Sequence, residues 1–131
     1  MMRLIISLLA GLVLSTSALA LEKESFSHER FEQLQAEGAL VLVDVFASWC
    51  STCARQQEIL ADYVDQHPDV DLHVLEIDYD EDRALVRQFR APRQSTLLLY
   101  KGEDQHWFSV AETREEVIFR EINRAAEFGE E

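Results

Sequence analysis

The chain has 131 residues, and its 12 basic and 25 acidic residues give a formal net charge of −13 at pH 7. This charge disfavours nucleic acid and anionic membrane surfaces as partners, because binding to either requires a basic patch. The length suits one domain with a single hydrophobic core. The two cysteines lie three residues apart and cannot join distant segments, so packing rather than a disulfide framework must stabilise the fold.

The first 20 residues have the pattern of a secretory signal peptide. Arg3 supplies a positive charge, and Leu4 to Leu14 form an apolar stretch that is short for a membrane span. Ala18 to Ala20 match the small-residue signature of a cleavage site, so we expect the mature domain to comprise residues 21–131. Cleavage would place this domain in the periplasm or outside the cell, and an uncleaved membrane anchor is the alternative interpretation.

The mature chain begins with the signals of a helix followed by a buried strand. Ser27 is a favourable N-cap, and Phe26 and Phe31 have the spacing of a hydrophobic staple. Gly38 is placed to end this helix. The unbroken apolar run from Leu40 to Phe46 is typical of a strand that is buried on both faces.

Two further helices are predicted on either side of a second strand. The longer helix should run from residue 51 to residue 66 and end before Pro68. Residues 70–77 form the second apolar strand pattern, and residues 81–89 predict a short helix. An irregular loop is expected at residues 90–95.

The last third of the chain predicts a hairpin and a final helix. Residues 96–100 and 105–110 read as two antiparallel strands joined by a turn. Thr113 and Glu116 have the spacing of a capping box that starts the last helix. The resulting order of helices and strands predicts an α/β fold with a mixed central sheet and helices on both faces.

Both cysteines follow the first apolar strand, at the mouth of the long helix. Chemistry in open α/β sheets gathers outside the carboxyl ends of the strands. The stretch Val43 to Cys53 resembles the active-site stretch of the thioredoxin family, and Thr96 to Glu103 resembles the family's β-hairpin after its cis-proline loop. The resemblance extends over essentially the whole mature chain. It implies a thioredoxin-like three-layer α/β/α sandwich and a thiol–disulfide oxidoreductase.

Cys50 is the candidate nucleophile of this motif. Disulfide exchange requires a thiolate, which unpaired N–H groups and the helix dipole stabilise at a helix N-terminus. The pKa of Cys50 should therefore lie below that of a free cysteine. The resemblance implies that Cys50 is the exposed attacking residue and that Cys53 is the buried resolving residue. An inert local disulfide is the alternative reading.

Asp44 interrupts the most apolar run of the protein. Burial should raise the pKa of this carboxyl group unless it finds a partner. The resemblance implies that Asp44 takes and returns the proton of the Cys53 thiol, whereas the alternative is that it only caps a backbone group. The family often carries a lysine near this acid, and the matching position here is Val74.

Trp49, Ser95 and Thr96 are the expected substrate-binding residues. Trp49 should shield the cysteines and offer a flat apolar surface to partners. Ser95 stands where the family has its cis-proline, and a cis bond before a non-proline residue costs about 3–4 kcal/mol. The bond is therefore either trans or held cis under strain, with the Ser95 hydroxyl facing the cysteines. We expect Ser95→Pro to be tolerated by the fold.

The predicted function is thiol–disulfide exchange with extracytoplasmic proteins by a monomer that needs no metal or other cofactor. The resemblance implies a membrane thiol-electron transporter as donor if the protein is a reductase, and the sequence leaves the direction open. Two alternatives remain, a Cu(I) carrier and a redox-inert binding module on the same scaffold. A zinc site would need four ligands, and the scattered histidines match no ligand spacing.

Overall fold

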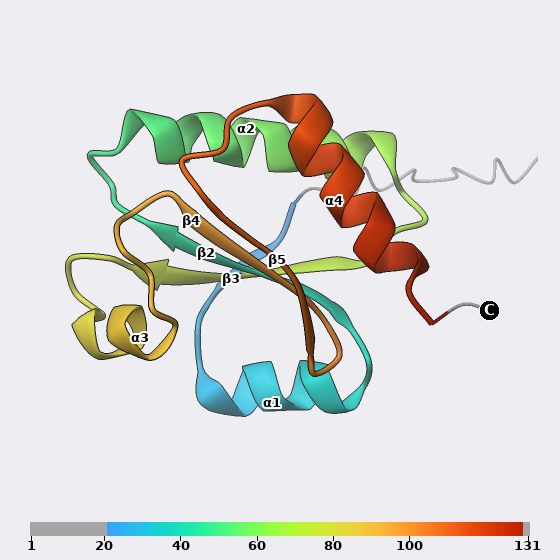
Figure 1. Cartoon of the computed structure of the whole chain (residues 1–131), viewed down its shortest axis with the longest axis horizontal. Coiled ribbons are helices and arrows are strands. Elements are labelled where there is room, and N and C mark those ends of the chain that lie inside the picture. The colour runs from blue at the N-terminus through green and yellow to red at the C-terminus, as the bar shows by residue number, and fades with distance from the viewer. Residues whose placement is uncertain (1–20, 130–131) are drawn as a thin grey trace, which may run out of the picture.

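The computed structural model describes residues 21–129, so the expected signal peptide at residues 1–20 lies outside the described residues. A five-stranded sheet of order β1-β3-β2-β4-β5 forms the centre of the molecule (Figure 1). Its strands are β1 (Lys23–Ser25), β2 (Leu40–Phe46), β3 (Leu72–Asp78), β4 (Thr96–Lys101) and β5 (Asp104–Val110). The helices are α1 (His28–Ala36), α2 (Ser51–Gln66), α3 (Arg83–Gln88) and α4 (Glu115–Glu127).

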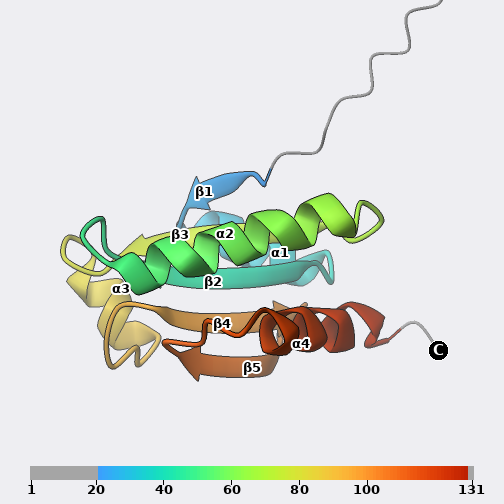
Figure 2. The same ribbon diagram turned by 90° about the horizontal axis from the view of Figure 1, so that it is seen from above.

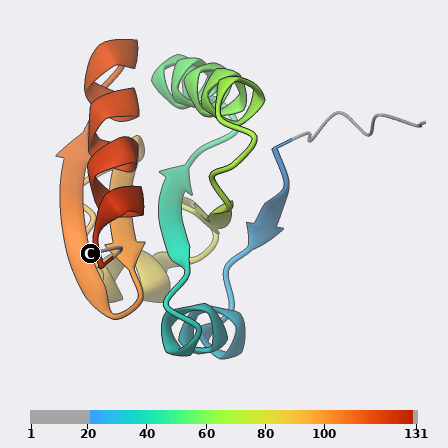
Figure 3. The ribbon, with the colours of Figure 1, turned by 90° about the vertical axis from the view of Figure 1, so that its right-hand side faces the viewer.

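The sheet is mixed and has helices on both faces, as predicted. Strands β1, β3 and β2 are parallel, whereas β4 and β5 form an antiparallel hairpin that pairs with β2. Helices α2 and α4 cover one face and α1 and α3 the other (Figures 1 and 3). From above, α2 runs along β2 and β3 while α4 runs along the hairpin (Figure 2). This arrangement confirms the three-layer α/β/α sandwich.

Strand β2 divides the core into two layers because successive side chains of a strand point to opposite faces. Val41, Val43 and Val45 pack in the layer that α1 and α3 cover. Leu40 and Leu42 pack in the other layer, against α2 and α4. The next residue in this second series is Asp44, so the alternation turns its carboxyl group toward α2.

The main element that the sequence pattern did not indicate is β1. Its three residues are polar and lack the alternation that identifies a strand. Strand β1 forms because it pairs in parallel with the edge of β3, placing Lys23 opposite Val74 and Ser25 opposite Glu76. Tertiary pairing therefore determines this strand, rather than local preference.

The helix starts were predicted with mixed success. Ser27 caps α1 through a 3.1 Å bond that its hydroxyl accepts from the Arg30 N–H, and Phe26 contacts Phe31 as a staple. The capping box at Thr113 is wrong, because α4 begins at Glu115 after the N-cap residue Arg114.

Several element ends also differ from the predictions. Helix α3 is shorter than the predicted 81–89, and β3 begins at Leu72 rather than Val70. No helix within residues 21–129 is long and apolar enough to cross a membrane.

Candidate active site

Cys50 and Cys53 form a disulfide at the start of α2. Cys50 is the N-cap residue of the helix, and its sulfur accepts a 3.1 Å hydrogen bond from the Cys53 N–H. The start of the helix therefore directs the Cys53 N–H at the Cys50 sulfur, where it would stabilise a thiolate after reduction. Cys50 is 7% exposed and Cys53 is 2% exposed, so the expected exposed nucleophile is itself largely buried.

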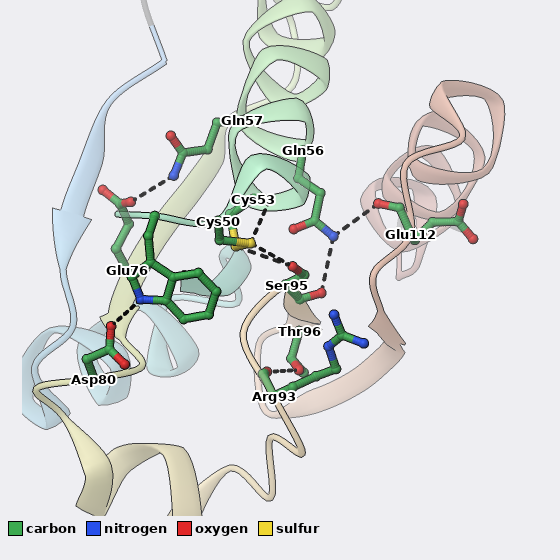
Figure 4. The surroundings of a disulfide bond; sticks show 11 residues. Cys50, Cys53, Gln56, Gln57, Glu76, Asp80, Arg93, Ser95, Thr96 and Glu112 are labelled. Atoms are coloured by element: carbon green, nitrogen blue, oxygen red, sulfur yellow. Dashed lines mark hydrogen bonds between the residues drawn. A yellow bond between two sulfur atoms is a disulfide. The ribbon is translucent and has the colours of Figure 1, made fainter. Parts of the chain in front are cut away.

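Ser95 approaches the disulfide from the loop before β4 (Figure 4). Its Oγ lies 3.2 Å from the sulfur of Cys50 and 3.3 Å from that of Cys53. The side chain is completely buried. The expected proximity of the Ser95 hydroxyl to the cysteines is therefore present.

The backbone at Ser95 has an unusual conformation that excludes proline. Its φ is 67°, and no peptide bond within the described residues is cis. Its N–H donates a 2.8 Å hydrogen bond to the carbonyl of Val45 on β2. Proline fixes φ near −65° and has no N–H to donate. The expectation that the fold tolerates Ser95→Pro is therefore wrong for this loop geometry.

Gln56 holds the same loop from the other side and was not singled out from the sequence. Its Nε2 donates to the carbonyl of Ser95 at 3.2 Å and to the carbonyl of Glu112 at 3.0 Å (Figure 4). The N–H of Ala111 donates a further 2.9 Å bond to the Ser95 carbonyl. The sequence signal was the three-residue spacing from Cys53 to Gln56, which places both side chains on the buried face of α2.

Asp44 is fully buried beneath α2, and neither of its carboxyl oxygens has a hydrogen-bond partner among the described residues. It lies between Glu76 on β3 and Leu97 on β4 in the sheet register. Burial, followed by the charge of Glu76, raises the pKa of Asp44 to about 7, against the opposing effects of the Gln57 amide and the Lys23 ammonium. Near neutral pH the group can therefore accept or release a proton.

A cavity of about 280 Å³ opens beside the cysteines, and residues from β1, β2, β3 and α2 contribute to its lining. At its wall the Nζ of Lys23 donates to Oε1 of Gln57 at 3.2 Å and lies 3.9 Å from Oε1 of Glu76. Gln57 in turn donates to Oε2 of Glu76 at 3.4 Å (Figure 4). Burial raises the pKa of Glu76, and Lys23 opposes that rise. Sequence reasoning missed Lys23 because it missed β1.

The other expected substrate-binding residues differ in accessibility. Trp49 is 63% exposed, and its indole N–H donates a 2.7 Å bond to Oδ2 of Asp80. Thr96 is fully buried, and its hydroxyl donates a 2.6 Å bond to the carbonyl of Arg93 (Figure 4). Trp49 is thus the exposed member of the expected set. Within residues 21–129, no group of three or more His, Cys, Asp or Glu residues could hold a metal ion.

Comparisons with known proteins agree with this geometry. The thioredoxin family model matches residues 19–124. Thioredoxin from Chlamydia pneumoniae is 31% identical over 100 residues, which cover 76% of this chain and 95% of the relative. Thioredoxin-1 from Saccharomyces cerevisiae is 32% identical over 72 residues, which cover 55% of this chain and 68% of the relative.

A similar structure is the crystal structure of Trxlp from Edwardsiella tarda, with 38% identity and a TM-score of 0.70. The match covers 76% of this chain and 96% of that one. The similar sequences, the fold and the position of the cysteine pair all indicate the same family. The chain belongs to the thioredoxin family and is a thiol–disulfide oxidoreductase with its cysteine pair at Cys50 and Cys53.

Proposed function

We propose that the chain exchanges disulfides with protein substrates outside the cytoplasm. The observation that carries the proposal is the Cys50–Cys53 disulfide at the N-terminus of α2, beside the exposed indole of Trp49. The signal-peptide pattern of residues 1–20 supports an extracytoplasmic site of action. The cysteine pair is itself the redox centre, and we propose a monomer that needs no further cofactor.

Reduction of a substrate proceeds in two displacements. The thiolate of Cys50 attacks one sulfur of the substrate disulfide, and the other substrate sulfur leaves as a thiolate. The thiolate of Cys53 then attacks the sulfur of Cys50, so that the Cys50–Cys53 bond forms and the bond from Cys50 to the substrate breaks. The substrate gains two electrons and the protein loses two. Oxidation of a substrate is the same sequence in reverse.

The second displacement requires that Cys53 lose its proton. Asp44 is the proposed acceptor, because it lies beneath α2 and its pKa of about 7 allows it to be ionised before the transfer and protonated after it. The proton can then return to solvent when Asp44 ionises again. Burying a carboxyl group costs free energy. The proposed proton transfer gives Asp44 a functional reason to be buried despite this cost.

The direction of net electron flow depends on the reduction potential of the pair relative to its redox partner. A reductase in an oxidising compartment needs a supply of electrons, and a membrane thiol-electron transporter is the proposed donor. Equilibration of the full chain with defined ratios of reduced and oxidised glutathione would measure the potential. A potential similar to those of reducing thioredoxins would favour the reductase direction.

Trapping of mixed disulfides tests the proposed roles of the two cysteines. The full chain carrying Cys53→Ser should accumulate covalent complexes with substrate proteins through Cys50, because the resolving thiol is absent. Acid quenching, alkylation and non-reducing gels would detect these complexes, and the double variant lacking both thiols is the matched control. Trapping by Cys50→Ser instead would reverse the order of attack.

Cell fractionation tests the proposed location. We expect the complexes in the extracytoplasmic fraction and a mature N-terminus at Leu21 in direct sequencing. Full-length chain confined to the cytoplasm would contradict the proposal.

A further inference from the structure

The hydroxyl of Ser95 lies almost equally close to the two sulfurs that react. The distances are 3.2 Å to Cys50 and 3.3 Å to Cys53. These sulfurs are the only hydrogen-bond partners of the hydroxyl within residues 21–129. A disulfide sulfur is a weak acceptor, but a thiolate is charged and forms a much stronger hydrogen bond. After reduction, the hydroxyl should therefore favour the hydrogen bond to whichever sulfur is a thiolate.

We propose that Ser95 is a catalytic residue whose hydroxyl donates a hydrogen bond to whichever active-site sulfur carries the negative charge. This inference rests on the cysteine roles of the proposed function. Cys50 is the charged sulfur during attack on the substrate, and Cys53 is the charged sulfur during resolution. A rotation of the Ser95 hydroxyl is enough to pass from one to the other, so one donor serves both displacements.

The hydroxyl takes no part in the covalent changes and keeps its proton throughout. In the second displacement the proton of the Cys53 thiol goes to Asp44, and the Cys53 thiolate accepts the hydrogen bond from Ser95. That thiolate then forms the bond to the sulfur of Cys50, and the substrate sulfur leaves with the electron pair of the broken bond. Bonds, protons and electrons therefore balance as in the proposed exchange.

The surroundings of Ser95 fix its hydroxyl in this place. Its N–H is bonded to Val45, and its carbonyl accepts bonds from Gln56 and Ala111. The residue is completely buried, so water does not compete for the hydroxyl. A positive φ costs stability in a residue with a side chain, and such strain clusters at active sites. Gln56 acts here as a positioning residue.

This role differs from what the family likeness implies. Ser95 occupies the position at which the family has its cis-proline, and a proline there has neither an N–H nor a hydroxyl to donate. The donor is therefore a property of this chain's own serine.

Two substitutions separate the hydroxyl from the backbone strain. Ser95→Ala and Ser95→Gly both delete the hydroxyl, but glycine adopts a positive φ readily whereas alanine does not. In each reduced variant we expect the pH midpoint of Cys50 alkylation to rise by about one unit, the size expected for a hydrogen bond to a charged group. Thermal melts should give Ser95→Gly a higher Tm than Ser95→Ala. This difference reports the backbone strain independently of the hydrogen bond.

Ser25→Ala is the matched control, because it removes an exposed hydroxyl on β1, outside the active-site stretch, that makes no hydrogen bond with either sulfur. Its alkylation midpoint should equal that of the unchanged chain. An equal rise in both Ser95 variants supports the proposal. An unchanged midpoint in both, or a rise in only one of them, overturns it. Failure of the Cys53→Ser trap in a chain that retains Ser95 would instead count against the proposed function, so the two failures are distinguishable.

Discussion

Lys23 on β1 lies directly opposite Val74 on β3, and its side chain lines the cavity beside the cysteines. Thioredoxins often have a lysine at the position of Val74. In this chain a neighbouring strand supplies the positive charge on the same face of the sheet, because residues opposite each other in register point to the same side. The charge lowers the pKa of Asp44, although burial has the larger, opposite effect.

Replacement of Lys23 should alter the pH dependence of the resolving step. Lys23→Met keeps most of the apolar stem but removes the charge, so the pKa of Asp44 should rise and less Asp44 will be ionised at pH 7. We expect resolution of a preformed mixed disulfide to slow several-fold at pH 7 and to recover as the pH increases. Stopped-flow measurement of the decay between pH 6 and 9 would test this.

Two further variants give the Lys23 experiment its controls. Lys23→Arg keeps the charge and should preserve the profile, and Lys101→Met removes a lysine that lines a different cavity, away from the cysteines. A Lys23→Met profile that coincides with that of the unchanged chain would show that this lysine does not affect the proton acceptor.

The pKa of Asp44 also has a consequence for stability. Its folded-state pKa of about 7 exceeds the ordinary aspartate pKa of 3.8, so the folded state binds the proton more tightly than the unfolded chain. The free energy of unfolding should therefore decrease as the pH rises from about 4 through 7. At a pH well above 7, the difference between the folded and unfolded pKa values corresponds to a loss of roughly 4 kcal/mol in the free energy of unfolding. The Asp44→Asn variant has no ionisable group at this position, so its free energy of unfolding does not decrease for this reason.

We expect the stability of Asp44→Asn relative to the unchanged chain to increase from pH 4 to pH 8. Urea denaturation of both oxidised proteins across this range would measure it. Asp62→Asn, which removes a carboxyl group at an exposed site on α2, is the matched control. A constant difference for Asp44→Asn would mean that the carboxyl group titrates alike in both states. Glu76, whose pKa is also raised, will leave a residual slope in both proteins.

The sequence predicted the layers and the reactive pair because both depend on local patterns. The apolar run of β2, the N-cap at Ser27 and the spacing of Cys50 and Cys53 are each readable from neighbouring residues. Strand β1 was not predicted, because its conformation depends on pairing with β3 rather than on its own residues. The lysine that it carries was therefore missed as well.

The conformation of the Ser95 loop was also beyond sequence reasoning. A departure from the family's proline indicated that the loop differs, but several backbone geometries fit a serine. The main chain of Ser95, with its positive φ, makes three hydrogen bonds: its N–H donates to β2, and its carbonyl accepts from the Gln56 side chain and from the segment before α4. The predicted capping box at Thr113 is absent because another local interaction forms at the start of α4. The carboxylate of Glu112 accepts hydrogen bonds from the N–H and the guanidinium of Arg114, the N-cap residue.

Trp49 should matter for protein substrates more than for small ones. Its exposed indole is held by Asp80 at the edge of the active site, where a protein partner would cover it. We expect Trp49→Ala to raise the KM for a protein disulfide roughly tenfold, as loss of an aromatic anchor does at interfaces. The rate with a small aromatic disulfide should change little, and turnover assays on both substrates would compare them.

Phe108→Ala is the control for Trp49, since it removes another exposed aromatic side chain, on β5. It should leave the KM for the protein disulfide unchanged. Equal losses for Trp49→Ala on the small and the protein substrate would assign the indole to the chemistry of the cysteines rather than to partner binding.

The last prediction concerns proline at Ser95, the residue that restores the family's usual sequence. Proline cannot reach a φ of 67°, and its ring removes the N–H that Ser95 donates to Val45. The buried carbonyl of Val45 would lose its partner, which alone costs about 1–3 kcal/mol. We therefore expect Ser95→Pro to lower the free energy of unfolding by at least about 2 kcal/mol, measured by urea denaturation of the oxidised chain. Ser95→Gly keeps the N–H and accepts the positive φ, so it should remain close to the unchanged chain. A proline variant as stable as the glycine variant would mean that the loop can adopt a second backbone conformation without the bond to β2.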